Sequence, residues 1–144
     1  MVTYEMKAGR EFLIRMPKGE DIIAVIEKFC EEKDIRSAAV WGIGAVERAV
    51  LGFYDAKSGQ YLSIPRDEQM EVVHCAGNVS RKEWKVHVHL HVILADREGR
   101  CFGGHLLPGS VIFAGEFYIS EFKNEPPERV HDPETDLFLW KKRE

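Results

Sequence analysis

The 144-residue sequence is poor in amide side chains and has no long apolar run. Only Gln60, Gln69, Asn78 and Asn124 carry an amide, while 31% of the residues are charged, a balance more frequent in proteins from thermophiles. No apolar stretch approaches the ~18 residues that a membrane-spanning helix needs, so we expect no membrane partner. The sequence also opens without the pattern of a signal peptide, so we do not expect secretion.

Cysteine is scarce as well. The three cysteines, Cys30, Cys75 and Cys101, are odd in number, lie far apart and form no CxxC motif, so a disulfide framework is not expected. We therefore expect reduced thiols that behave as small, partly buried side chains, as is usual in the cytoplasm. The sequence thus predicts a cytoplasmic protein.

Positive charge is not in excess: 20 basic residues face 24 acidic ones, and the formal net charge is −4. Affinity for nucleic acid comes largely from phosphates neutralised by Lys and Arg, so this balance does not support DNA binding. The basic runs, Arg81-Lys82 and Lys141-Lys142-Arg143, are too short to form a binding tail. No linker or repeat divides the chain, and we expect a single domain over residues 1–144.

One amphipathic helix and many short strands are expected. Apolar residues recur with helical spacing between Gly19 and Lys33, with Glu20 and Asp21 in the first turn, where the helix dipole favours anions. Apolar segments bounded by turn residues predict strands over 12–16, 37–41, 49–54, 61–64, 71–79, 86–95, 100–106, 111–122 and 136–140. Hairpin turns between them predict an α+β fold, a mostly antiparallel β-sheet with one main amphipathic helix packed on it.

Two glycine-rich segments need an explanation. Gly42-Ile43-Gly44-Ala45 admits two interpretations, a phosphate-binding loop or a bend or bulge in a sheet. A full GxGxxG motif would require a third glycine where Glu47 stands, so the bend or bulge is favoured. Gly103 and Gly104 would weaken their strand, which predicts a close approach of backbone from a neighbouring strand or subunit.

Three of the six histidines alternate along one expected strand, and this is the main chemical feature of the sequence. Because residues two apart lie ~6.6–6.8 Å apart on one face of a strand, His89 and His91 can converge on one metal ion. His87 would lie roughly 13 Å from His91, so it is not expected to share that ion, and it has no assigned role. The alternative is that these histidines pack in a polar core or an interface without a metal. His74 is expected to be structural, and His131 to be solvated in a loop.

The turn after this strand decides whether a third histidine joins the pair. With the three-residue loop Arg97-Glu98-Gly99, His91 falls opposite His105 on the same face of the hairpin. Directly paired residues have Cβ atoms ~4.5–5.5 Å apart, close enough to share an ion. With a two-residue loop, His105 would instead face Val92 and point away. Glycine suits the left-handed third position of the longer loop, which favours the first register.

Three neutral imidazoles from His89, His91 and His105 would leave one tetrahedral position of a zinc ion, or of another divalent transition metal, open to water or substrate. Such a site suits hydrolysis or hydration, but the sequence fixes no base, and whether the protein is an enzyme stays open. The candidate carboxylates, each more often a surface or hydrogen-bonded group, are Glu71, Glu116 and Glu121.

The order of these features resembles that of the plants-and-prokaryotes-conserved (PPC) domain family over about the whole chain. The segments that carry the resemblance are Phe12-Leu13-Ile14-Arg15 with Gly19-Glu20-Asp21-Ile22, Ile35 to Ala45, Leu51-Gly52-Phe53-Tyr54-Asp55, Glu71 to Asn78, His89-Leu90-His91-Val92 and Gly103-Gly104-His105-Leu106. Their order and spacing together carry more weight than any one motif.

This resemblance implies a homotrimer of single α+β domains, in which the HxH and GGH histidines of prokaryotic members look like a metal site. Plant members have generally lost the GGH histidine, and this sequence lacks the Arg-Gly-Arg-Pro core of an AT-hook. The alternative function is a DNA-binding or regulatory module without an AT-hook. Its basic patch, gathered by the trimer, would comprise Arg81, Lys82 and Lys85. A trimer would also cover apolar residues that look exposed, namely Trp41, Phe117 and Trp140.

Overall fold

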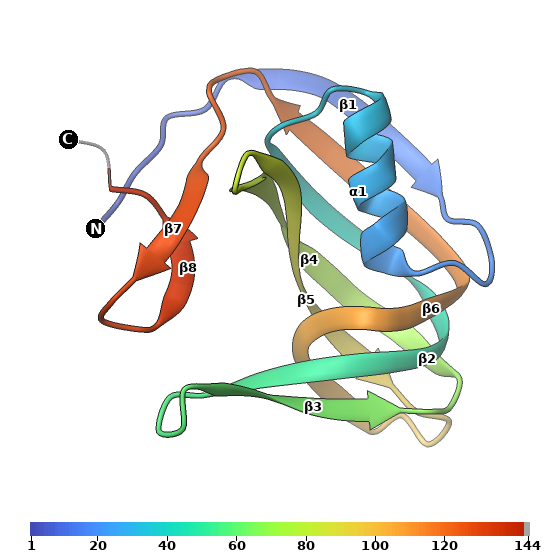
Figure 1. Cartoon of the computed structure of the whole chain (residues 1–144). Helices are drawn as coiled ribbons and strands as arrows, with labels where there is room; N and C mark the ends of the chain where they lie inside the picture. Colours follow the sequence, from blue (N-terminus) through green and yellow to red (C-terminus); the bar gives the residue numbers. More distant parts are fainter. Residues whose placement is uncertain (143–144) are drawn as a thin grey trace.

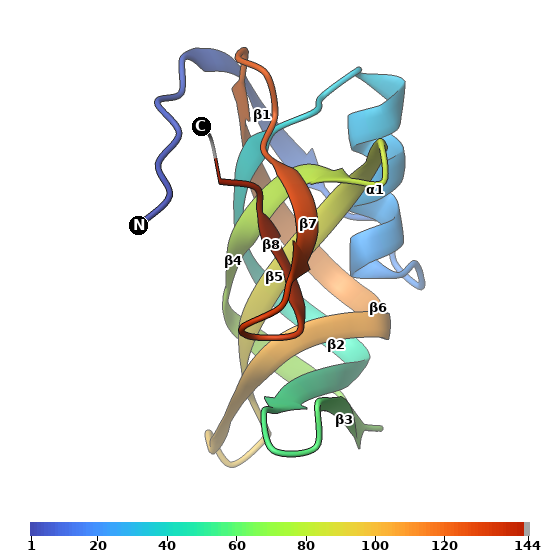
Figure 2. The same cartoon turned by 60° about the vertical axis from the view of Figure 1, so that its left-hand side comes forward.

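The described part of the chain, residues 1–142 of this computed structural model, forms eight strands and one helix (Figure 1). In chain order the elements are β1 (Ala8–Arg15), α1 (Ile22–Glu32), β2 (Ala38–Asp55), β3 (Gln60–Arg66), β4 (Met70–Lys82), β5 (Lys85–Ala95), β6 (Cys101–Phe122), β7 (Glu128–Asp132) and β8 (Leu137–Trp140). The helix lies on one side of the strands (Figure 2). The predicted α+β fold with one main helix is confirmed.

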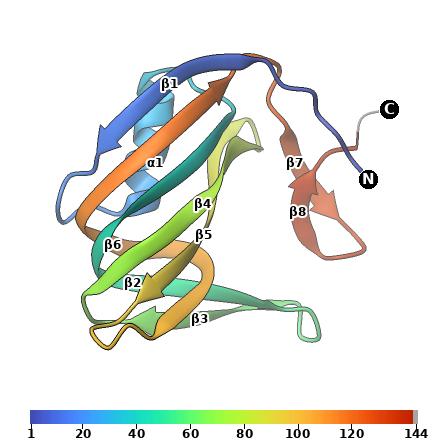
Figure 3. The same ribbon diagram turned by 180° about the vertical axis from the view of Figure 1, so that it is seen from behind.

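The strands pair into one sheet in the order β3-β2-β6-β5-β4-β7-β8, with β1 on β6. Strands β1, β6, β2 and β4 lie side by side (Figure 3). Strand β2 pairs with both β4 and β6, and β5 also pairs with both β4 and β6. Strands β2, β4, β5 and β6 therefore form a closed ring of pairings and not a flat layer. Within the described residues, only the short contact between β4 and β7 is parallel, so the predicted antiparallel sheet is confirmed.

Helix α1 is shorter than predicted because a side-chain cap fixes its start. Gly19 has a φ of +84°, outside the helical region, and the carboxylate of Asp21 accepts a hydrogen bond from the backbone N–H of Ala24 at 3.0 Å. Glu20 and Asp21 therefore precede the first turn and do not lie in it. The buried face, which packs on β5 and β6, consists of Ile22, Ile23, Ile26 and Cys30. No helix in the described residues is long and apolar enough to span a membrane.

Two pairs of predicted strands are single long strands in the structure. They are 37–41 with 49–54, now β2, and 100–106 with 111–122, now β6. Register shifts let these strands bend where an interruption was expected. Gly44 (φ +149°) lies at one shift, where a Cβ would overlap the carbonyl oxygen of Ala114. The bulge interpretation of this segment is confirmed, and strand structure on both sides excludes a phosphate loop that opens a helix.

The core lies between α1 and the inner face of the sheet. The inward residues of β5, all at most 5% exposed, are Val88, Leu90, Val92 and Leu94. The histidines of β5 alternate with them and therefore point to the outer face. Trp41 lies on this outer face and stacks on Tyr118 with ring centroids 5.5 Å apart. The prediction that the histidines of this strand share one face is thus confirmed.

Phe117 does not lie on the surface, as the sequence suggested, but is only 2% exposed. Its ring lies over Gly42, where the absence of a Cβ makes room for it. Of the three apolar residues expected at an interface, Trp41 and Trp140 remain exposed, each at 40%.

The hairpin β7–β8 follows only in part from the sequence. β8 matches the expected strand over 136–140, whereas β7 is an additional strand that pairs with β4 where Arg129 lies beside Lys82. Beyond this contact, the hairpin projects away from the other strands (Figure 1). His131, expected in a loop, lies in β7. It is exposed as predicted, and its Nε2 is 2.7 Å from the carboxylate of Asp136.

Candidate metal centre

The turn between β5 and β6 sets the register that the predicted metal site requires. Its three-residue loop ends in Gly99 with a φ of +77°, and the backbone N–H of Asp96 donates to the carbonyl oxygen of Arg100 at 3.0 Å. Further along the two strands, His91 pairs directly with His105. The register predicted from the glycine is confirmed, and the alternative two-residue loop is wrong.

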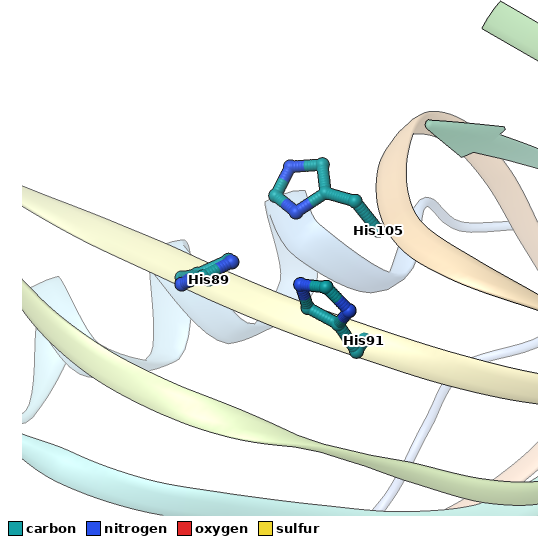
Figure 4. Close-up of side chains that lie close together, drawn as sticks. All are labelled: His89, His91 and His105. Carbon is teal, nitrogen blue, oxygen red and sulfur yellow. The ribbon is translucent and has the colours of Figure 1, made fainter. Parts of the chain in front are cut away.

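The side chains of His89, His91 and His105 come together on the outer face of the sheet (Figure 4). Ring centroids are 5.1 Å apart for His89 and His91, 5.0 Å for His89 and His105, and 5.4 Å for His91 and His105. One ligand nitrogen from each ring lies within 4.8 Å of the other two. A tetrahedral zinc ion, with bonds of ~2.0–2.1 Å, would hold these nitrogens about 3.3 Å apart, so the three rings would have to close in on a bound ion.

This donor set fits a divalent transition metal. Nδ1 of His105 is buried and has no hydrogen-bond partner in the described structure, a costly state that a metal ion bound to this nitrogen would relieve. Imidazole nitrogens suit zinc and its neighbours better than Mg²⁺ or Ca²⁺, which prefer oxygen. His91 is exposed, whereas His89 and His105 are partly buried, so solvent can reach the cluster from the side of His91.

Backbone crowding around β6 accounts for the two glycines before His105. A Cβ on Gly104 would lie 3.0 Å from the carbonyl oxygen of Gly52, and a Cβ on Gly103 would lie 3.1 Å from that of Val92. The predicted close approach therefore comes from β2 and β5 of the same chain.

Arg129 of β7 lies beside the cluster, although nothing in the sequence singled it out. The residue is 8% exposed. Its Nε donates to Oγ of Ser80 at 2.8 Å, Nη1 to the carbonyl oxygen of Phe138 at 3.1 Å, and Nη2 to Oδ1 of Asn78 at 3.0 Å. Nη2 also lies 3.3 Å from Nδ1 of His89. Because the guanidinium is always protonated, Nδ1 is the acceptor in this contact.

Burial lowers the pKa of His89 and His105 in the cluster and of His87 beside it. It lowers the pKa of His89 to about 4, with the nearby charge of Arg129 as the next cause. Burial is also the main cause that lowers the pKa of His87 to about 4, and the charge of Arg129 is the second cause. The pKa of His105 is lowered too, mainly by burial and next by the charge that His91 carries when protonated. At neutral pH these rings therefore carry a free lone pair, which is the form that binds metal ions.

The remaining candidates from the sequence lie outside the cluster. Glu121 is buried in an ion pair with Arg10, with Oε2 and Nε 2.7 Å apart. Glu71 and Glu116 are exposed, and no carboxylate in residues 1–142 hydrogen-bonds to the three clustered rings. No catalytic base is therefore assigned. His74, expected to be structural, is exposed on β4.

Two cavities meet at His89 and Arg129, which line both. The smaller one has a volume of about 290 Å³ and also borders His87 and His105. The larger one, of about 670 Å³, is lined mostly by β7, β8 and the segment after them. The smaller volume suits a small organic molecule. His87, which had no assigned role, is thus part of the wall of a cavity beside the cluster.

The Plants and Prokaryotes Conserved (PCC) domain matches residues 3–123 of this chain. The chain belongs to the PCC family. PCC and PPC are two abbreviations for the same domain, so the resemblance to the PPC family that the sequence showed is confirmed. The match includes the three clustered histidines of this PCC chain. It ends before β7, so Arg129 lies outside it.

Solved structures share the PCC fold over nearly the full chain. A metal-containing protein from Archaeoglobus fulgidus is 39% identical with a TM-score of 0.94, over 99% of this chain and 100% of that one. A plant- and prokaryote-conserved protein from Pyrococcus horikoshii is 35% identical with a TM-score of 0.92, over 100% and 99%. A candidate DNA-binding protein from Bacteroides thetaiotaomicron is 27% identical with a TM-score of 0.86, over 94% and 96%.

Among curated proteins, the bifunctional protein GlmU of a Synechococcus species is 28% identical over 128 residues. The match covers 88% of this chain but 19% of that protein. The chain thus spans about a fifth of the length of the curated relatives it matches, and their activities are not carried over to it.

Proposed function

We propose that this PCC protein binds one zinc ion, or another divalent transition-metal ion, per chain through His89, His91 and His105. The observation that carries the proposal is the convergence of three imidazole nitrogens within 4.8 Å, produced by the register of β5 and β6. The buried Nδ1 of His105, which has no partner, supports it. A related protein from Archaeoglobus fulgidus is described as metal-containing, which adds further support.

The ligand set would form an open site. Three neutral ligands leave the charge of the ion uncompensated and one tetrahedral position free, an arrangement typical of catalytic zinc and not of structural zinc. An ion held in this way can polarise a bound oxygen or lower the pKa of a bound water. Since no carboxylate in residues 1–142 hydrogen-bonds to the three rings, we assign binding and no reaction.

The test is the amount of metal bound per chain, measured by elemental analysis on protein purified without a polyhistidine tag. We expect about one transition-metal ion per chain and its loss in the His105→Ala variant. His74→Ala is the matched control, because His74 is an exposed histidine of β4 outside the cluster, and this variant should keep its metal. Equal metal content in the two variants, or none in the wild type after zinc is offered, would contradict the proposal.

We further propose that the protein assembles as a homotrimer, as the family resemblance implies. Support comes from the outer face of the sheet, where apolar side chains remain exposed. Trp41 and Tyr118 stack there, and Leu13 and Ile43 are 77% and 52% exposed. Contiguous exposed apolar patches of this kind mark interaction surfaces.

A DNA-binding or regulatory role is the alternative function. A similar structure from Bacteroides thetaiotaomicron is described as a candidate DNA-binding protein, and the β4–β5 turn presents Trp84, 78% exposed, between Arg81 and Lys85. Lys82, the third cation of the expected patch, lies instead 3.7 Å from the ring centroid of Phe138. The net charge of −4 also opposes this role. DNA binding that weakens steeply with salt would support it, and no binding at low salt would exclude it.

A further inference from the structure

Arg129 and a metal ion would compete for the same lone pair of His89. A neutral imidazole has one in-plane lone pair, and here that of Nδ1 faces Nη2 of Arg129 at 3.3 Å. A metal ion bound through Nδ1 would use this lone pair, and one bound through Nε2 would leave the ring proton on Nδ1. In both cases the hydrogen bond is lost, and one N–H of the guanidinium beside the cluster has no acceptor.

The positive charge of Arg129 also lacks a counter-ion. Its hydrogen-bond partners are all neutral, namely Ser80, Asn78, His89 and the carbonyl group of Phe138. The other charged side chains buried in residues 1–142, Asp96 and Glu121, each pair with an arginine, whereas Arg129 forms no ion pair. Because a buried, unpaired charge is costly, an anion next to Arg129 would stabilise the structure. A divalent ion on the three histidines would strengthen this preference.

The smaller cavity offers room for such an anion. It has a volume of about 290 Å³, and its wall contains Arg129 and two of the proposed metal ligands, His89 and His105. Three aromatic rings complete this part of the wall, namely Tyr54, Tyr61 and Phe138. Lys82 adds a second cation to the wall. Asp136 is the carboxylate among its lining residues, and it is engaged with His131 at 2.7 Å.

We propose that this cavity binds a small organic carboxylate, held by Arg129 and drawn to the ion that the three histidines would bind. The inference rests on the proposed metal site. The planar fork of a guanidinium matches a carboxylate, and the aromatic wall suits the organic part of the molecule better than it suits an inorganic anion. By linkage, the metal ion and the carboxylate each raise the affinity of the other.

The first test uses the wild-type protein alone. The probe is 4-fluorobenzoate, with 4-fluorobenzamide as its neutral isostere, and fluorine NMR measures the dissociation constant of each with metal-loaded and with metal-stripped protein. We expect metal loading to tighten binding of the benzoate about tenfold or more and to leave that of the amide unchanged. If loaded protein binds the two probes equally, or if metal loading does not affect the benzoate, the inference is wrong.

A second test asks whether Arg129 is the residue that binds the carboxylate of 4-fluorobenzoate. Arg129→Gln removes the charge, and Arg81→Gln is the matched control, because Arg81 is a cation of β4 that does not line this cavity. We expect Arg129→Gln to keep its metal but to bind 4-fluorobenzoate about tenfold more weakly, and Arg81→Gln to bind it as the wild type does. Undiminished binding by metal-loaded Arg129→Gln would overturn the assignment, and if this variant fails to fold, the wild-type comparison decides.

The two proposals fail in different ways. If elemental analysis finds no metal in the wild type, the metal site is wrong and the carboxylate site falls with it. If the metal is present but 4-fluorobenzoate binds independently of it, only the carboxylate site is wrong.

Discussion

Asp96, Glu121 and Arg129 are the charged side chains that the fold buries among its described residues. Asp96 and Glu121 each lie 2.7 Å from the Nε of an arginine, so their charges are compensated within the chain. Arg129 has only neutral partners, and one of them is a histidine of the candidate metal site. This difference is why we place an anionic ligand at Arg129.

Glu121→Gln should destabilise the fold at neutral pH. The carboxylate of Glu121 accepts hydrogen bonds from Nε, Nη2 and the backbone N–H of Arg10. These bonds, chiefly those from the side chain, hold the pKa of Glu121 below its ordinary value. A neutral amide loses the charge-assisted bonds, at a cost of about 1.5–3 kcal/mol in the free energy of unfolding. Urea denaturation measures this cost, and Glu116→Gln, at an exposed position of the same strand, should change little.

The same ion pair predicts a dependence on acid. A carboxyl group with a lowered pKa in the folded chain stabilises the fold above its unfolded pKa, and this contribution is lost as the pH falls through the folded pKa. The difference in unfolding free energy between wild type and Glu121→Gln should therefore be largest near neutral pH and shrink below about pH 4. A difference that stays constant down to acid pH would show that the ionised carboxylate is not the cause.

The sequence predicted the clustered histidines but not Arg129, for a physical reason. The spacing of His89 and His91 and the glycine in the turn before β6 are local features, so the convergence can be counted along the chain. The side-chain partners of Arg129 on β4 and β5 lie 40 to 51 residues away. No pattern within the five residues of β7 marks the side chain that turns inward.

At the scale of the elements, hairpin register could be predicted, but strand length could not. The β5–β6 loop closes within a few residues, and Gly99 alone favours its type. The long strands β2 and β6 bend because each changes its pairing partners along its length. Both strands contain residues that usually interrupt a strand, namely Gly42 and Gly44 in β2 and Pro108 and Gly109 in β6. The sequence alone therefore predicts a break at each place, although the strands continue through them.

Gly77→Ala tests how closely β4 and β5 approach behind the histidines. A Cβ at Gly77 would overlap the carbonyl oxygen of His89, so the two strands would have to separate. We expect a loss of about 3 kcal/mol in the free energy of unfolding, together with weaker metal binding as His89 shifts.

Gly103→Ala is the comparison for this prediction, since its Cβ would lie 3.1 Å from the carbonyl oxygen of Val92. This crowding is much milder than the overlap at Gly77, so the loss of stability should be smaller. Chemical denaturation and zinc titration of both variants supply the comparison. Similar losses in Gly77→Ala and Gly103→Ala would mean that the close approach at Gly77 is not what limits this part of the sheet.

At the scale of the whole molecule, the candidate metal site borders an exposed apolar face. Directly paired residues lead from His91 through Ala76 to Trp41, then to Tyr118 and Leu13. Helix α1 covers the other side of the sheet (Figure 2). A further chain docked on the outer face would therefore lie next to the histidines. The sequence indicated single exposed residues but not this row, because the row depends on the pairing of five strands.

The proposed homotrimer gives a direct expectation for the mass in solution. Light scattering should yield three times the 16.5 kDa of one chain. Trp41→Glu should shift the protein to the monomer, because burying an unpaired charge in an interface is costly. Trp84→Glu, at an exposed aromatic residue of the β4–β5 turn, should leave the mass unchanged. A monomeric wild type would contradict the proposal.

The central claim, on which the proposed carboxylate site also depends, is that His89, His91 and His105 hold a metal ion. X-ray absorption at the zinc edge of zinc-loaded protein tests it most directly. We predict scattering from three imidazole rings with zinc–nitrogen distances of ~2.0–2.1 Å, and fewer rings in the His105→Ala variant. A sulfur shell at ~2.3 Å, which would assign the zinc to a cysteine such as the exposed Cys101, or the absence of imidazole scattering, would contradict it.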